Sequence, residues 1–219
     1  MPDLLLINPN ASHATTDMMV GIAQAAMPAG FRVVGVTAGR GPQMIVDESE
    51  LAAAALDVEH AWHATPGEWA GVIVSAFGDP GMERVRAACP APVVGICEAS
   101  MREAAAGGRR FGIATVTPRL SAALAAKAVH YGVGDAYTGI RLTAGDPRLL
   151  SQDPAALENA LADAVRLCIE QDGAEAVVIG GGPLGQAALG LAARFSQPVI
   201  APIDSAARRL LAQLLQTTG

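Results

Sequence analysis

Short apolar runs alternate with longer segments of helical periodicity along most of the chain. The runs with strand character cover residues 4–7, 31–36, 71–75, 92–97, 111–116, 137–143, 176–179 and 198–203. Small and apolar residues recur at helical spacing over residues 15–26, 48–63, 98–106, 118–131 and 154–172, and a final helix is predicted from Asp204. Runs that are apolar throughout are typical of parallel strands buried on both faces, so this alternation predicts an α/β fold.

Two of the predicted strands end in a turn of small residues that opens a helix. Residues 71–75 lead into Ala-Phe-Gly-Asp-Pro-Gly at 76–81, and residues 176–179 lead into Gly-Gly-Gly-Pro at 180–183. A short helix follows each turn, and after it comes a proline-led apolar run that ends in an acid, Glu98 or Asp204. Equivalent positions in the two copies are 105 or 106 residues apart, which indicates a duplicated α/β unit.

The duplication predicts two pseudo-twofold-related halves, residues 1–108 and 109–219, each an open four-stranded parallel sheet with helices on both faces. The final helix is free to pack back on the N-terminal half. Because no flexible linker separates the halves, we expect them to share a cleft. Ligands of such sheets bind beyond the carboxyl ends of the strands, so the active site is predicted in this cleft. The loop at residues 38–45 is long enough to lie over it.

The composition narrows the classes of function. Of the 219 residues, 51% are apolar and 16% are charged; the net charge is −6, and Lys and Arg form no cluster. This balance argues against nucleic-acid partners and against an anionic membrane surface. No apolar run could span a bilayer, the N-terminus lacks the basic start of a signal peptide, and the three cysteines show no metal spacing. We therefore expect a cytoplasmic protein that acts on a small molecule without a metal or cofactor.

Small and polar residues gather where the predicted strands end. The backbone N–H groups of the two turns suit a carboxylate, an enolate or another oxyanion, although either turn alone fits an ordinary strand-to-helix connection. Their matched positions favour a functional pair. The asparagine amides and the hydroxyl groups could bind substrate oxygens or could serve only as turn and cap residues. The predicted binding residues are Asn8, Asn10, Ser75, Phe77, Gly78, Thr115, Val116, Thr117, Gly182 and Pro183.

Few ionisable residues lie near the predicted cleft. Glu98 could transfer protons together with Asp204, but the helix dipole alone also favours an acid in a first helical turn. His13 follows the asparagines closely enough to act as a base, although an exposed loop histidine is the commoner case. Asp79 and Thr117 each precede a proline, so each is predicted to cap the helix that starts there.

Several strings of the chain, taken together, resemble a known family. They are Leu-Ile-Asn-Pro-Asn at 6–10, Phe-Gly-Asp-Pro-Gly at 77–81, Val-Gly at 94–95 with Glu-Ala at 98–99, and Phe-Gly-Ile at 111–113 before Pro-Arg at 118–119. In this order, and over essentially the whole chain, they resemble the hydantoin racemase branch of the aspartate/glutamate racemase superfamily. The resemblance implies two similar parallel α/β halves with the active site between them, and a homo-oligomer.

The resemblance also implies two catalytic cysteines, one from each half, which remove a proton from one face of a carbon acid and return one to the other. In this chain the matching positions hold Ala76 and Gly181. Neither side chain can carry a proton, so two-cysteine racemisation is not expected. Glu98, His13 or a bound water would have to take over that work.

The leading expectation is an isomerase-type pocket that binds a small carboxylate or a cyclic amide, such as a 5-substituted hydantoin, and stabilises an enolate-like state. The first alternative is a cysteine-independent lyase, decarboxylase or hydrolase on a similar substrate. The second alternative is a non-catalytic binder, or a cysteine-to-alanine mutant that traps its ligand.

Overall fold

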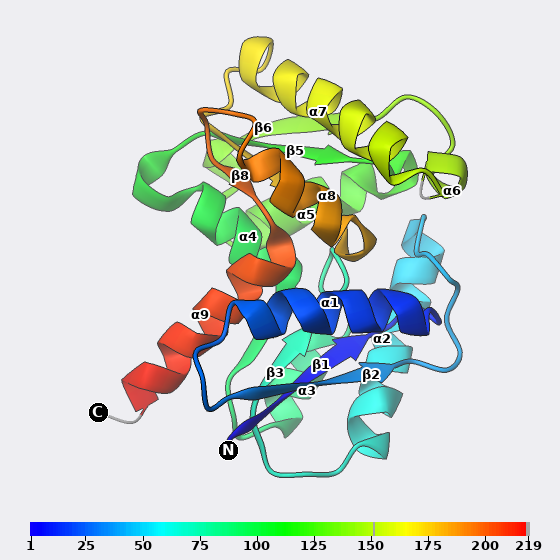
Figure 1. Ribbon diagram of the computed structural model, residues 1–219, viewed down its shortest axis with the longest axis vertical. Coiled ribbons are helices and arrows are strands. Elements are labelled where there is room, and N and C mark those ends of the chain that lie inside the picture. Colours follow the sequence, from blue (N-terminus) through cyan, green and yellow to red (C-terminus); the bar gives the residue numbers. More distant parts are fainter. Residues whose placement is uncertain (151, 218–219) are drawn as a thin grey trace.

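The computed structural model describes residues 1–150 and 152–217, which contain two four-stranded parallel sheets (Figure 1). The first sheet has the order β2-β1-β3-β4 and the second has the order β6-β5-β7-β8. The bounds are β1 (Asp3–Asn8), β2 (Arg32–Thr37), β3 (Trp69–Val74), β4 (Val93–Gly95), β5 (Phe111–Thr115), β6 (Tyr137–Leu142), β7 (Ala176–Ile179) and β8 (Val199–Ile200). The repeated order confirms the predicted α/β fold of two similar halves.

Helices pack against both sheets. They are α1 (His13–Ala25), α2 (Glu48–Ala64), α3 (Met82–Ala88), α4 (Ile96–Ala104), α5 (Ser121–His130), α6 (Pro147–Leu150), α7 (Pro154–Glu170), α8 (Gly185–Ala192) and α9 (Pro202–Thr217). On the first sheet α1 packs with α9, and α2 packs with α3. On the second sheet α7 packs with α8, and α4 packs with α5. None of the described helices is both long and apolar enough to cross a membrane.

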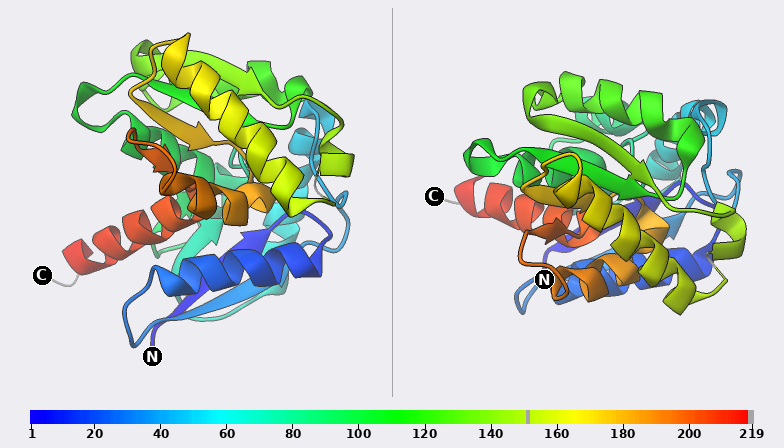
Figure 2. Two further views of the ribbon diagram at one scale, coloured as in Figure 1. Left: turned by 45° about the horizontal axis from the view of Figure 1, so that its top comes forward. Right: turned by 90° about the horizontal axis from the view of Figure 1, so that it is seen from above.

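The last helix of each repeat packs across the molecule. Helix α4 follows β4 but contacts β7, β8 and α5 as well, and α9 follows β8 but lies against α1, β3 and β4. Figure 2 shows α9, in red, leaving the second sheet and running along the first. The two helices also contact each other. The division of the chain between residues 108 and 109 stays a prediction, and the packing of both helices crosses it.

Helix α7 begins as the sequence predicts. The Asp153 carboxylate accepts hydrogen bonds from the first-turn N–H groups, and a proline occupies the first turn. One apolar stripe of this helix is buried against the second sheet, and it consists of Leu157, Leu161, Val165 and Cys168. Burying a side chain of this kind contributes about 1.5–3 kcal/mol, so the stripe fixes which face of α7 meets the sheet.

Of the two predicted helix caps, Asp79 is wrong and Thr117 is confirmed in its position only. Asp79 does not cap the next helix, because its φ is 50° and α3 begins only at Met82. The Asp79 carboxylate instead accepts hydrogen bonds from N–H groups in the first turn of α4. Thr117 is the N-cap of a 3₁₀ turn at Pro118–Leu120, which precedes α5, but its side chain makes no capping hydrogen bond.

Candidate active site

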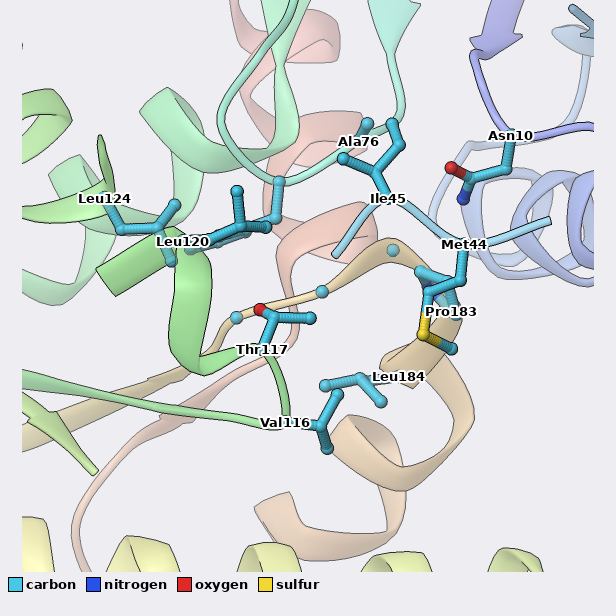
Figure 3. A pocket seen from close by; sticks show the side chains of 14 residues that line it. Asn10, Met44, Ile45, Ala76, Val116, Thr117, Leu120, Leu124, Pro183 and Leu184 are labelled. Carbon is cyan, nitrogen blue, oxygen red and sulfur yellow. The ribbon is translucent and has the colours of Figure 1, made fainter. Parts of the chain in front are cut away.

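A pocket opens where the carboxyl ends of the two sheets meet, and loops of both sheets line it (Figure 3). Its empty volume is about 480 Å³, which includes space that is open to solvent. The walls come from the segments after β1, β2, β3, β5 and β7 and from the start of α5. The lining residues are Asn10, Met44, Ile45, Ala76, Phe77, Val116, Thr117, Leu120, Leu124, Gly180, Gly181, Gly182, Pro183 and Leu184.

Both positions at which the resemblance implies cysteines line this pocket. Ala76 follows β3 of the first sheet, and Gly181 follows β7 of the second. The φ of Gly181 is 170°, which is extended backbone that any residue adopts. A Cβ at this position would nevertheless lie 2.9 Å from Cγ and Cδ1 of Leu184. A side chain at residue 181 therefore needs Leu184 to move, whereas Ala76 already carries a Cβ.

Asn10 is the polar residue at the β1 side of the pocket. It is 2% exposed, and its Oδ1 atom has no hydrogen-bond partner among the described residues. Figure 3 shows its amide group turned into the pocket. Asn8 lies behind it: the Asn8 Oδ1 accepts the Asn10 N–H at 3.0 Å, and the Asn8 Nδ2 donates to the Thr16 hydroxyl at 2.9 Å. Asn8 thus orients the loop that carries Asn10.

The two threonines after β5 have different positions. The Thr115 hydroxyl is buried and donates to the carbonyl oxygen of Gly180 at 2.5 Å, which ties the end of β5 to the turn after β7. The Thr117 hydroxyl lies 3.4 Å from that of Thr115 and belongs to the pocket lining. Thr117 is therefore part of the pocket wall, and Thr115 lies behind it.

Three further predicted residues lie outside the lining. The Ser75 hydroxyl is buried 3.0 Å from the Sδ atom of Met19. Gly78 lies against Leu51, and its φ is 112°. His13 is the first residue of α1, and it is exposed.

Glu98 also lies outside the lining, in the first turn of α4. Its carboxylate accepts hydrogen bonds from Arg86 at 2.9 Å and from Arg102 at 3.0 Å. Burial tends to raise the pKa of Glu98, but the hydrogen bonds and charges of the two arginines outweigh burial and lower it. The arrangement holds an ionised carboxylate in an ion-pair cluster and does not present it to the pocket.

The chemistry of the pocket follows from its lining. Among the described lining residues none has an acid or base side chain, so the polar groups are an amide, a hydroxyl and backbone N–H and C=O groups. No group of three His, Cys, Asp or Glu side chains that could hold a metal ion occurs within residues 1–150 and 152–217. Such a pocket can bind polar atoms and apolar groups, but its side chains cannot transfer protons at neutral pH.

Comparison with known proteins then places the chain. A family model described as Asp/Glu/hydantoin racemase matches residues 4–210. The chain belongs to this family.

It is 28% identical to a hydantoin racemase of Paenarthrobacter aurescens over 209 residues, which are 94% of this chain and 88% of the relative. It is 29% identical to a hydantoin racemase of Pseudomonas sp. (strain NS671) over 201 residues, or 89% and 79% of the two chains. The solved structure of an allantoin racemase from Klebsiella pneumoniae superposes with a TM-score of 0.92 at 25% identity, covering 99% and 89% of the chains.

As a member of the Asp/Glu/hydantoin racemase family, the chain is a racemase- or isomerase-like enzyme.

The sequence predicts only some of the apolar residues that line the pocket. Of the loop at residues 38–45, Met44 and Ile45 belong to the pocket wall. Leu120, Leu124 and Leu184 were not among the predicted residues. Leu120 and Leu124 are four residues apart at the start of a helix that follows a strand end, and this spacing is the signal that could have found them.

Proposed function

We propose that the pocket binds a neutral cyclic amide of the 5-substituted hydantoin type and, as an isomerase does, stabilises the enolate-like form of this ligand. The observation that carries the proposal is the Oδ1 atom of Asn10, a buried acceptor in the lining without a partner in the described chain. Leaving such an acceptor unpaired costs about 1–3 kcal/mol, so a ligand that supplies a donor is favoured. A cyclic amide supplies ring N–H groups, whereas an ionised carboxylate supplies none.

The apolar wall fits the same class of ligand. Met44, Ile45, Leu120 and Leu124 offer an uncharged surface to an alkyl or aryl substituent. An ionised ligand would lose hydration here without gaining an ion pair from any described lining residue. The similarity to two hydantoin racemases over most of the chain supports the same choice.

Backbone donors beside the pocket support the enolate part of the proposal. Among the described residues, none accepts a hydrogen bond from the N–H of Ala76 or Phe77. We assign these two groups to the ring oxygen that gains negative charge when the C5 proton leaves. The N–H of Gly181 is excluded from this role because it donates to the carbonyl oxygen of Ile179 at 3.0 Å.

Proton transfer is assigned to water. One water takes the C5 proton and becomes hydronium, while the C–H electron pair moves toward the ring carbonyl oxygen. A second water, on the opposite face, donates a proton to C5, and the hydroxide that it leaves is neutralised by the hydronium. The product is the other enantiomer. Because water is a weak base, this reaction is slower than one with positioned thiols. The same lack of acid and base side chains favours a second candidate function, which is binding without turnover.

Deuterium incorporation at C5, followed by mass spectrometry in D2O, tests the proposal. The probes are 5-benzylhydantoin and 5-isobutylhydantoin, with benzylmalonate as the carboxylate comparison. Exchange above the protein-free rate supports the isomerase. Binding by calorimetry without exchange supports the second candidate, and the absence of both refutes the two together.

Variants of Asn10 test the observation on which the proposal rests. Asn10→Leu removes the acceptor at similar size, so we expect it to weaken hydantoin binding about tenfold, whereas Asn10→Asp keeps an acceptor and should bind nearly as well as the parent. Equal losses in the two variants would contradict the acceptor role. Ala76→Cys should accelerate exchange if the pocket is of racemase type, and Ala53→Cys, at an exposed site on α2, controls for an added thiol.

A further inference from the structure

Asp79 ends the turn that carries two pocket residues, Ala76 and Phe77. Its N–H donates to the Ala76 carbonyl oxygen at 3.0 Å. Its side chain is buried, and among the described residues it is the one non-glycine residue with a positive φ. A buried carboxylate and a left-handed backbone each cost free energy, and such costs concentrate at functional sites.

The Asp79 carboxylate accepts three hydrogen bonds from two other elements. Its Oδ1 accepts the Cys97 N–H at 2.9 Å, and its Oδ2 accepts the Glu98 N–H at 2.7 Å. The Tyr131 hydroxyl also donates to Oδ2 at 2.7 Å. Helix α4 has no capping side chain of its own; its N-cap is Gly95, where a Cβ would overlap the Asp79 carboxylate. A negative charge from another segment therefore occupies the N-terminus of α4.

The bond to Tyr131 connects the two sides of the pocket. Tyr131 follows the last turn of α5, a helix of the second repeat. The other end of this helix and the 3₁₀ turn before it carry Leu124 and Leu120 of the pocket wall. The turn with Ala76 is thus joined, through one buried carboxylate, to the helix that supplies the facing wall.

We propose that Asp79 is a positioning residue of the pocket. By holding the turn at residues 76–79 against α4 and Tyr131, it fixes the backbone donors of that turn relative to the wall formed by α5. Asp79 is not in the lining, so it acts on a ligand only through this turn.

Hydrogen exchange of the backbone tests the positioning without any ligand. Tyr131→Phe removes one of the three hydrogen bonds and keeps the ring, and Tyr137→Phe is the matched control because Tyr137 packs on Phe111 away from this network. We expect exchange in residues 74–82 and 93–100 to rise about tenfold in Tyr131→Phe, with residues 176–179 of β7 unchanged as the internal reference. Parental exchange rates in residues 74–82 of Tyr131→Phe would overturn the proposal.

The link to the pocket is tested by calorimetry with 5-benzylhydantoin, and this arm rests on the proposed function. The Kd should rise about tenfold in Tyr131→Phe and stay unchanged in Tyr137→Phe. If the parent protein does not bind, the proposed function fails and the exchange data alone decide the role of Asp79. Equal binding by the parent and Tyr131→Phe, together with faster exchange, would overturn the link to the pocket.

Gly95 offers an independent second variant. Gly95→Ala should displace the Asp79 carboxylate and reproduce the exchange pattern of Tyr131→Phe. In an Asp79→Gly background, where the carboxylate is gone and glycine accepts the positive φ, adding Gly95→Ala should change exchange in residues 74–82 less than twofold. Additive effects of the two substitutions would contradict the proposed contact.

Discussion

Replacing Glu98 by glutamine tests whether this residue stabilises the fold, as its contacts indicate, or takes part in catalysis, as its sequence position suggests. The carboxyl side chain is 9% exposed, and each oxygen accepts a hydrogen bond from a different arginine, Arg86 or Arg102. Glutamine keeps the shape but replaces one acceptor oxygen with an NH2 donor. This donor would face a guanidinium group, which has donors only.

The expected loss follows from these contacts. A hydrogen bond between charged groups contributes about 1.5–3 kcal/mol, and removing one partner of a fully buried pair costs about 3–5 kcal/mol. Arg86 and Arg102 are 38% and 41% exposed, so both can turn toward water, and the lower part of the range applies. We expect Glu98→Gln to lower the free energy of unfolding at pH 7 by about 1.5–2 kcal/mol.

Urea unfolding measures this loss, and Glu83→Gln is the matched control. Glu83 pairs with the same Arg86 but is 60% exposed, so its substitution should cost less than about 0.5 kcal/mol. Deuterium exchange at C5 should be unchanged in Glu98→Gln, because Glu98 does not line the pocket. Equal destabilisation by the two variants, or lost exchange in a stable Glu98→Gln protein, would refute the reasoning.

The pH dependence gives a further check on Glu98. Because its folded-state pKa is lowered, the unfolded state binds the proton more tightly. The stability that the ionised side chain contributes is therefore present above the unfolded value of about 4.5 and is lost as the pH falls through the folded value. The difference in unfolding free energy between the parent and Glu98→Gln should shrink on acidification below about pH 4.5.

Three other predictions concern Asp79, Gly181 and the loop at residues 38–45. Burial raises the pKa of Asp79 to about 6, although its hydrogen bonds favour the ionised form. Because the folded state binds the proton more tightly than the unfolded state, the parent should lose up to about 3 kcal/mol of stability relative to Asp79→Asn as the pH rises from 4 through 6. Urea unfolding at each pH measures this loss. Gly181→Cys should lower the free energy of unfolding by about 1–3 kcal/mol, because the new Cβ meets Leu184. In a Leu184→Ala background the same substitution should lower it less, and a double-mutant cycle measures the difference. Arg119→Gln removes the 2.8 Å ion pair with Asp47, the N-cap of α2, which follows the loop at residues 38–45. It should weaken hydantoin binding about two- to fivefold at low salt and less at high salt, by calorimetry.

The elements with a local signal could be predicted from the sequence, and those with a distant partner could not. Apolar runs located the eight strands of the described residues. The inner strands β1, β3, β5 and β7 are buried along most of their length, which explains their continuous apolar sequence. The edge strands β2 and β6 are only partly buried. Asp79 before a proline carries the mark of a helix cap, but its partners are N–H groups 18 and 19 residues later. The space for its carboxylate comes from Gly95, whose effect depends on tertiary packing. The same reason applies to Glu98, which two arginines hold away from the pocket lining.

In this duplicated fold, two parts of racemase chemistry depend on different groups: backbone N–H donors stabilise the enolate, and side chains carry the protons. Equivalent turns after β3 and β7 bring Ala76 and Gly181 to one pocket, and the backbone donors of a turn do not depend on the side chain it carries. Proton carriers do depend on side chains, and the two sites differ in the room they offer: Ala76 has a Cβ already, whereas a side chain at Gly181 meets Leu184. A thiol can therefore be added by one substitution on the first side and needs two on the second. Comparing C5 exchange in Ala76→Cys with that in Gly181→Cys/Leu184→Ala would measure how much rate a thiol adds to each face of a pocket whose backbone is unchanged.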